Sequence, residues 1–188
     1  MLFNSYAYIL VFLPISLIIY FYLNKIKNSL VSNYFLVAAS FFFYSYWDPK
    51  YLLLMLISVI FNYSIGTLLS KMNSKKAAKT ALFTGIAINL VALGYYKYAD
   101  FFIKSTNAVA GTNFDLQHIV LPLAISFFTF QQIAYLVDSY RGLTKEYDFL
   151  NYCLFVSFFP QLIAGPIVHH KEMMPQFEQT ENKKFIYE

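Results

Sequence analysis

Charged residues are scarce in this sequence: Asp, Glu, Lys and Arg make up 13% of 188 residues, whereas 59% are hydrophobic. The hydrophobic residues are gathered into long runs rather than spread along the chain, which is the composition of a membrane protein. Cysteine is almost absent too. The single Cys153 excludes an intrachain disulfide and leaves the redox compartment open.

Six stretches contain no charged residue at all, and most approach the roughly 20 residues that a helix needs to cross a bilayer. They are residues 1–24, 28–47, 51–70, 80–96, 116–137 and 149–168. None shows the alternation of apolar and polar residues that a transmembrane barrel strand requires. The sequence therefore predicts an all-α, polytopic transmembrane helical bundle of about six membrane segments.

The first apolar run has neither a basic region before it nor a small-residue cleavage site after it, so it is not predicted to be a signal peptide. Lys and Arg concentrate on the cytoplasmic side of membrane proteins. If the N-terminus lies outside, alternate crossings place eight basic residues in the cytoplasmic loops between segments and only three in the opposite loops. The eight are Lys25, Lys27, Lys71, Lys75, Lys76, Lys79, Arg141 and Lys145; the three are Lys50, Lys97 and Lys104.

No basic patch lies in a soluble region, which excludes a nucleic-acid partner; the net charge of +4 follows from topology and lipid headgroups. No repeat or linker divides the chain, so residues 1–188 are predicted to form a single membrane domain. Aromatic residues reach 21% and cluster at 41–47 and 95–102. Both clusters fall at predicted outer ends of segments, which is typical of an interfacial belt; a ring-lined binding cleft is the alternative.

Polar side chains inside apolar runs are the candidate functional residues, because unsatisfied polar groups are costly in hydrocarbon. Gln131, Tyr135 and Asp138 have the spacing of one helical face, and Arg141 follows three residues later. This face is either a polar stripe that holds helices together or the lining of an aqueous or acyl-carrying passage.

The run 157–177 is interrupted by proline and glycine, which favours a broken or re-entrant segment that lines a cavity. The candidate wall residues are Pro160, Gln161, Gly165, Pro166 and His169. Adjacent histidines at 169 and 170 point about 100° apart on a helix and cannot share one metal ion as an i, i+4 pair can. No metal site is predicted.

Two long motifs resemble a known family. PLAISFFTFQQIAYLVDSYRG (122–142) and NYCLFVSFFPQLIAGPIV (151–168) are similar to the membrane-bound O-acyltransferase family, in its branch of alginate O-acetylation and D-alanyl transfer proteins. The segments 44–56 and 94–102 also look like this branch, so the resemblance covers the whole chain.

The resemblance implies transfer of an acyl group, expected to be acetyl, to hydroxyls of an extracytoplasmic polysaccharide or cell-wall glycan. The acyl donor would be a substrate, acetyl-CoA or an acyl carrier protein thioester, with no bound cofactor. Expected partners are membrane lipid, the glycan acceptor and the other proteins of a polysaccharide-acetylation system. The expected location is the cell's cytoplasmic (inner) membrane, as a multi-pass protein.

In this family the catalytic histidine lies in a later membrane segment, and His118, His169 and His170 do not match it. No catalytic residue is therefore predicted in this chain, which is expected to be an N-terminal fragment of a longer O-acyltransferase and inactive alone. A noncatalytic membrane scaffold and a transporter subunit are the alternatives. The transporter is less favoured, because no Asp, Glu, Lys or Arg lies within these runs.

The charge asymmetry predicts the orientation of the loops. Single cysteines placed beside Lys27 and Lys75, in a Cys153→Ser background, should resist an impermeant thiol reagent in whole cells, because these positions face the cytoplasm. A cysteine at Asn107 should react. Labelling of the first two positions in intact cells would overturn the orientation.

Overall fold

The computed structural model describes residues 4–26, 29–46, 48–144, 148–162, 165 and 170–179. Within these ranges every regular element is a helix. In chain order they are the π-helical η1 (Ala7–Phe12), α1 (Leu13–Ile26), α2 (Ser29–Ser45), α3 (Pro49–Lys71), α4 (Lys75–Ala110), α5 (Ile125–Tyr140), α6 (Phe149–Ser157), α7 (Phe159–Leu162) and α8 (His170–Glu178).

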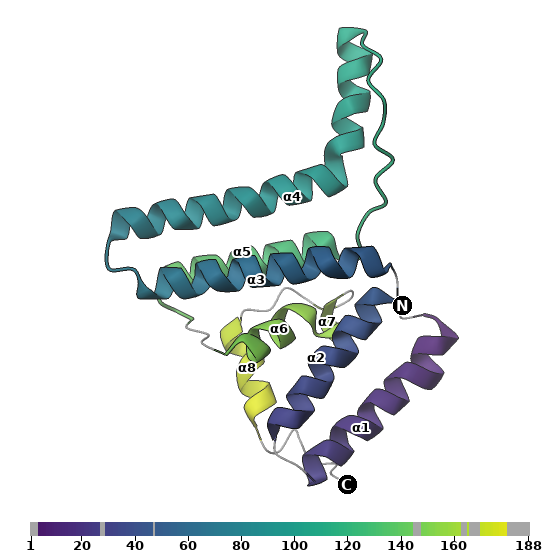
Figure 1. Cartoon of the computed structure of the whole chain (residues 1–188), viewed down its shortest axis with the longest axis vertical. Coiled ribbons are helices and arrows are strands. Elements are labelled where there is room, and N and C mark those ends of the chain that lie inside the picture. Colours follow the sequence, from purple (N-terminus) through teal and green to yellow (C-terminus); the bar gives the residue numbers. More distant parts are fainter. Residues whose placement is uncertain are drawn as a thin grey trace.

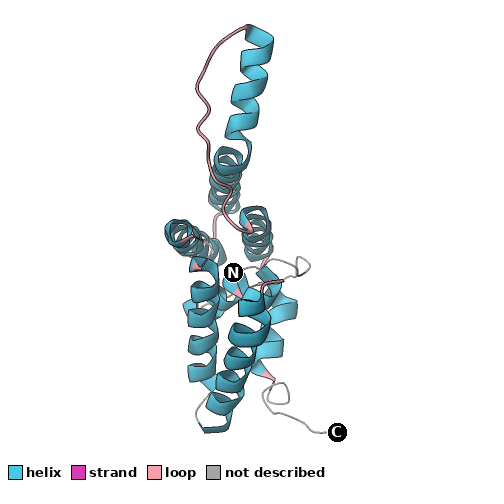
Figure 2. Cartoon of the chain, turned by 90° about the vertical axis from the view of Figure 1, so that its right-hand side faces the viewer, coloured by secondary structure: helices cyan, strands magenta, loops and turns pink. Residues whose placement is uncertain are grey.

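The helices form two groups that α6 connects. α1 and α2 lie side by side, and α3, α5 and the first part of α4 lie together across them (Figures 1 and 2). α6 contacts α2, α3, α5 and α8, so it touches both groups. The buried ring of Tyr135 on α5 packs against Tyr152 and Phe155 of α6.

Local sequence explains where several helices begin and end. Asp48 caps α3 by accepting from the Lys50 backbone N–H at 2.9 Å, with Pro49 in the first turn, and Asp148 caps α6 in the same way. Ser74 caps α4. Gly111 ends α4 with a φ of 64°, a left-handed conformation that favours glycine.

The predicted all-α membrane bundle is confirmed, but its segments do not match the helices one for one. Three described helical stretches are long and apolar enough to cross a membrane: Ala7–Ile26, Pro49–Lys71 and Lys75–Ala110. The apolar helix Leu30–Ser45 is shorter. The predicted segment 80–96 is only part of α4, because the helix continues through charged residues on both sides of that run.

The predicted segment 116–137 is not a continuous helix. The backbone is irregular from 111 to 124, and α5 begins only at Ile125. Pro122 cannot lie inside a helix without loss of a hydrogen bond, and it also disfavours helical geometry at the preceding residue. Counting charge-free residues detects apolarity but does not detect this interruption.

The segment 149–168 is broken within its described part, as predicted. α6 ends at Ser157, Phe158 leaves helical geometry, and α7 begins at Phe159. Pro160 lies in the first turn of α7, where its missing N–H breaks no helical hydrogen bond. The rest of the segment lies outside the described residues, apart from Gly165.

A close approach of α3 to α5 depends on the absence of a side chain at Gly66. A Cβ there would lie 2.3 Å from Cε1 of Tyr135. The Tyr135 ring is only 1% exposed and packs on Tyr152, with ring centroids 4.5 Å apart. It therefore has no free direction in which to move. α3 and α5 can pack at this distance only with glycine at position 66.

Two glycine substitutions test this packing. Gly66→Ala should destabilise the bundle by about 1–3 kcal/mol through overpacking against Tyr135. Gly94→Ala, also inside a helix, should be neutral or stabilising by up to about 1 kcal/mol, because no atom lies within 4 Å of its added Cβ. Thermal unfolding in detergent measures both. Equal shifts of the two unfolding midpoints would contradict the close approach.

Candidate functional site

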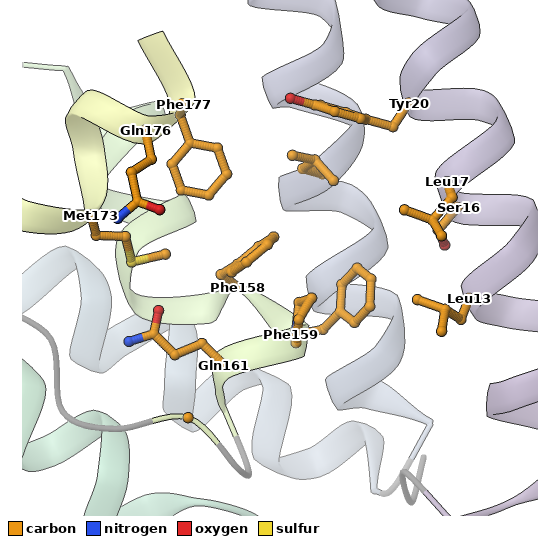
Figure 3. A pocket seen from close by; sticks show the side chains of 13 residues that line it. Leu13, Ser16, Leu17, Tyr20, Phe158, Phe159, Gln161, Met173, Gln176 and Phe177 are labelled. Carbon is orange, nitrogen blue, oxygen red and sulfur yellow. The ribbon is translucent and has the colours of Figure 1, made fainter. Parts of the chain in front are cut away.

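The break between α6 and α7 forms one wall of a cavity of about 630 Å³. α1 provides the opposite wall through Leu13, Ser16, Leu17 and Tyr20, while α2 contributes Leu36. α8 closes a third side with Met173, Gln176 and Phe177 (Figure 3). A volume of this size is typical of sites for small organic ligands.

The cavity is mainly apolar, with a few polar groups at its wall. Phe158 and Phe159 supply aromatic surface from the break itself, and Gln161 lines the same side. Tyr20 and Ser16 lie across from them. The described lining contains no histidine and no carboxylate. These residues can therefore bind and orient an apolar group, but they include no base that would take a proton from a hydroxyl near neutral pH.

Hydrogen bonds hold the broken segment on both sides of Phe158. Before the break, the Gln131 side chain on α5 donates to the Phe155 carbonyl oxygen at 2.8 Å. After it, the Phe159 backbone N–H donates to Ser40 Oγ on α2 at 3.3 Å. Ser40 in turn donates to the Leu36 carbonyl oxygen. The cavity wall is thus fixed to α5 and α2 by groups that are themselves buried.

A chain of buried polar side chains runs through α4, α3, α5 and α6. Asn62 and Asn89 exchange two hydrogen bonds, of 3.1 and 2.7 Å. Asn62 Nδ2 also donates to the Ser58 carbonyl oxygen at 2.9 Å and to the Ser58 hydroxyl oxygen at 3.5 Å. The same hydroxyl oxygen accepts from Gln132 Nε2 at 3.0 Å. The Tyr152 hydroxyl then donates to Gln132 Oε1 at 3.3 Å. We call this set, Asn89, Asn62, Ser58, Gln132 and Tyr152, the polar chain.

The predicted polar face of α5 lies mainly in the protein interior. Gln131, Tyr135 and Asp138 are all buried, so the spacing correctly placed them on one packed face. Arg141 is exposed and caps the C-terminus of the helix. None of these four residues lines the cavity. Their arrangement favours the interpretation of a stripe that holds helices together, and a passage-lining role for them stays a prediction.

The candidates from the broken segment occupy a different place. Pro160, Gln161 and Gly165 line the cavity. Pro166 and His169 lie outside the described residues, and α8 begins at His170. His118 is exposed on the irregular segment before α5. The structure thus separates the predicted site residues into an interior set on α5 and a cavity set after Phe158.

Several residues of the site were missed by sequence reasoning. Ser40, Ser58, Asn62 and Asn89 all lie inside charge-free runs, and each is buried or half-buried with a defined hydrogen-bond partner. The two asparagines carried a usable signal, since an amide in an apolar helix requires a partner from another helix. Among the described residues no cluster of three or more His, Cys, Asp or Glu could hold a metal ion.

Comparison with known proteins finds a family match and several similar proteins. Residues 139–186 match the profile of MBOAT, the membrane-bound O-acyltransferase family. A peptidoglycan O-acetyltransferase of Helicobacter pylori is 41% identical over 213 aligned positions, covering 100% of this chain and 40% of that protein. No solved structure matches the chain.

Alginate-modifying proteins are also similar. The probable alginate O-acetylase AlgI of Pseudomonas aeruginosa is 37% identical, and that of Pseudomonas putida is 36% identical. Each match covers 94% of this chain but only 34% and 37% of the respective relative. The chain therefore spans well under half the length of the curated relatives that it matches. Residues 139–186 thus match the membrane-bound O-acyltransferase family, and the whole chain is similar to part of these O-acetylating relatives.

Proposed function

We propose that this chain forms part of a membrane enzyme that transfers an acetyl group to hydroxyls of an extracytoplasmic glycan. The observation that carries the proposal is the match of the whole chain to a peptidoglycan O-acetyltransferase at 41% identity. The probable alginate O-acetylases support the same chemistry on a different polysaccharide. The shared element is O-acetylation of a glycan, and peptidoglycan is the first acceptor to test.

The reaction class defines what the described residues have to do. A sugar hydroxyl attacks the carbonyl of an acyl thioester, from acetyl-CoA or an acyl carrier protein, while a general base removes the hydroxyl proton. The C–O ester bond forms, the C–S bond breaks, and the donor leaves as a thiol after taking up a proton. The described part of the cavity lining supplies no such base, so these residues serve to bind and orient. Following the family resemblance, a histidine from a later membrane segment would complete the site.

The cavity is suited to guide the acyl-carrying group. Its wall is apolar enough to exclude water, and amides such as Gln161 could orient a carbonyl or a pantetheine-like amide. Ser40 and Gln131 hold the wall in place through the hydrogen bonds on either side of Phe158. A passage of this kind requires fixed walls, since small misplacements of a reacting group are costly to the rate.

The proposal extends to location and partners. The enzyme would be a multi-pass protein of the cytoplasmic membrane with its N-terminus outside, consistent with the basic residues around α3 and α4. It would act with the other proteins of a polysaccharide-acetylation system that deliver the acyl group and the glycan.

A chimera tests the proposed function. Residues 1–188 replace the matching part of the Helicobacter pylori peptidoglycan O-acetyltransferase, and the chimera is expressed in a strain that lacks the native enzyme. O-acetylation of peptidoglycan, measured by release of acetate from purified sacculi, should be restored to a substantial fraction of the native level. A chimera that reaches normal membrane levels without acetylating peptidoglycan would instead favour a noncatalytic scaffold or a different acceptor.

Two neighbouring residues of α1 test the cavity within that chimera. Leu17 lines the cavity, whereas Ile18 is 68% exposed and does not. Leu17→Trp should lower O-acetylation by roughly tenfold or more, because the indole fills space that the acyl group needs and displaces the wall. Ile18→Trp is the matched control and should leave activity near normal. Similar activities at equal membrane levels would exclude the cavity from the reaction path.

A further inference from the structure

α4 is much longer than a membrane span requires. Its 36 residues correspond to about 54 Å at 1.5 Å per residue, against a hydrocarbon core of about 30 Å. Figures 1 and 2 show that the second part of the helix turns away from the bundle and that the irregular segment after it returns alongside. We call residues 95–121 the arm.

The return segment is bound to one face of the arm helix. The Gln117 backbone N–H donates to Asp100 Oδ1 at 2.7 Å, and the Phe114 backbone N–H donates to Asn107 Oδ1 at 3.0 Å. Asn107 also donates to the Phe114 carbonyl oxygen at 2.9 Å. Asp100 and Asn107 are seven residues apart, which places them on the same side of the helix. The polar face is therefore already occupied by the chain itself.

The opposite face is an exposed stripe that is apolar at Tyr98, Phe102 and Val109 and is interrupted by Ser105 and Thr106. Phe102 and Val109 each follow Asp100 and Asn107 by two residues, which is about 200° around a helix. Phe102 is 62% exposed and Val109 is 90% exposed, and Tyr98 continues the same stripe at 43%. In a water-soluble hairpin the apolar face would be covered and the polar face solvated. Here the pattern is reversed, so the stripe requires an apolar environment.

The return segment sets the depth at which that environment lies. Its backbone is irregular from 111 to 124, and backbone groups without internal partners do not occur exposed to the hydrocarbon core. The arm must therefore lie where water reaches this backbone. The return segment needs water, and the stripe needs an apolar environment. The headgroup region of the membrane provides both, because water reaches the return segment there while the aromatic rings reach the acyl chains.

We propose that the arm lies in the membrane interface, with Tyr98, Phe102 and Val109 inserted among phospholipid headgroups and upper acyl chains. Lys97 and Lys104 occupy one flank of the helix, where they can extend to lipid phosphates. Lys97 Nζ also donates to Ser126 Oγ on α5 at 3.0 Å and lies 5.3 Å from the Tyr98 ring centroid. This contact ties the base of the arm to the bundle.

Tryptophan fluorescence in vesicles tests the proposal without reference to enzyme activity. The full chain, carrying Trp47→Phe so that one tryptophan remains, is reconstituted in phosphatidylcholine vesicles with Phe102→Trp as reporter. Phospholipids that carry bromine on the acyl chain near the headgroup should quench this tryptophan more than phospholipids that carry it near the chain end. Iodide in the aqueous phase should quench it weakly. Phe101→Trp, on the neighbouring exposed position, repeats the reading if the first variant fails to insert.

Two matched controls calibrate the depth. Val91→Trp, at an exposed position in the apolar part of α4, should be quenched most by bromine near the chain end. Asp115→Trp, exposed on the return segment, should be quenched most by iodide. If Phe102→Trp resembled Asp115→Trp, the arm would project into water, as a glycan-binding surface would. Protection from both quenchers would show that protein covers the stripe. Either outcome overturns the proposal.

Discussion

The polar chain is the constraint on which the rest of this bundle depends. Each of its side chains lies in an apolar helix, where an amide or hydroxyl without a partner costs several kcal/mol. The chain satisfies them in sequence, from Asn89 through Asn62 and Ser58 to Gln132 and Tyr152. A single hydrogen bond between membrane helices contributes only about 0.6 kcal/mol on average. The larger effect of the polar chain is on which helix packing forms, because any other packing of α3–α6 would leave several of these polar groups without partners.

The same helix, α5, connects this constraint to the cavity. Gln132 belongs to the polar chain, while its neighbour Gln131 holds the Phe155 carbonyl oxygen just before the break. Tyr135, one turn later, packs against Gly66 and Tyr152. The motif that resembles the acyltransferase family therefore places α6 relative to α3 and α4. The described residues of this first motif, 122–142, act on the cavity through that placement, since none of them lines it, whereas residues 158–161 of the second motif do.

Sequence reasoning predicted the fold class and a broken last segment because both follow from local chemistry: long charge-free runs, and the proline and glycine residues that interrupt the last one. The spacing of Gln131, Tyr135 and Asp138 placed them on one helical face, which is also a local property of the sequence. It did not predict the irregular stretch before Ile125, although Pro122 was visible, because apolar composition was counted without regard to backbone geometry. The pairing of Asn62 with Asn89 joins different helices, and a single sequence cannot specify which polar residues will meet.

The arm and the bundle solve the problem of polar groups in a membrane in opposite ways. In the bundle, the side chains of the polar chain are turned inward and bind one another. The outer surface can then remain apolar, as at Ile57 and Val91. In the arm there is no interior large enough to hide them. Asp100 and Asn107 instead accept hydrogen bonds from the backbone of the return segment. The rings of Tyr98 and Phe102 then face outward, and the other backbone groups of the return segment need water as a hydrogen-bond partner. A structure that needs an apolar environment for its rings and water for its backbone is stable only at a boundary between water and hydrocarbon. Two features thus set the position of α4 in the bilayer. Its apolar first part favours the hydrocarbon core, and the arm favours the interface between hydrocarbon and water.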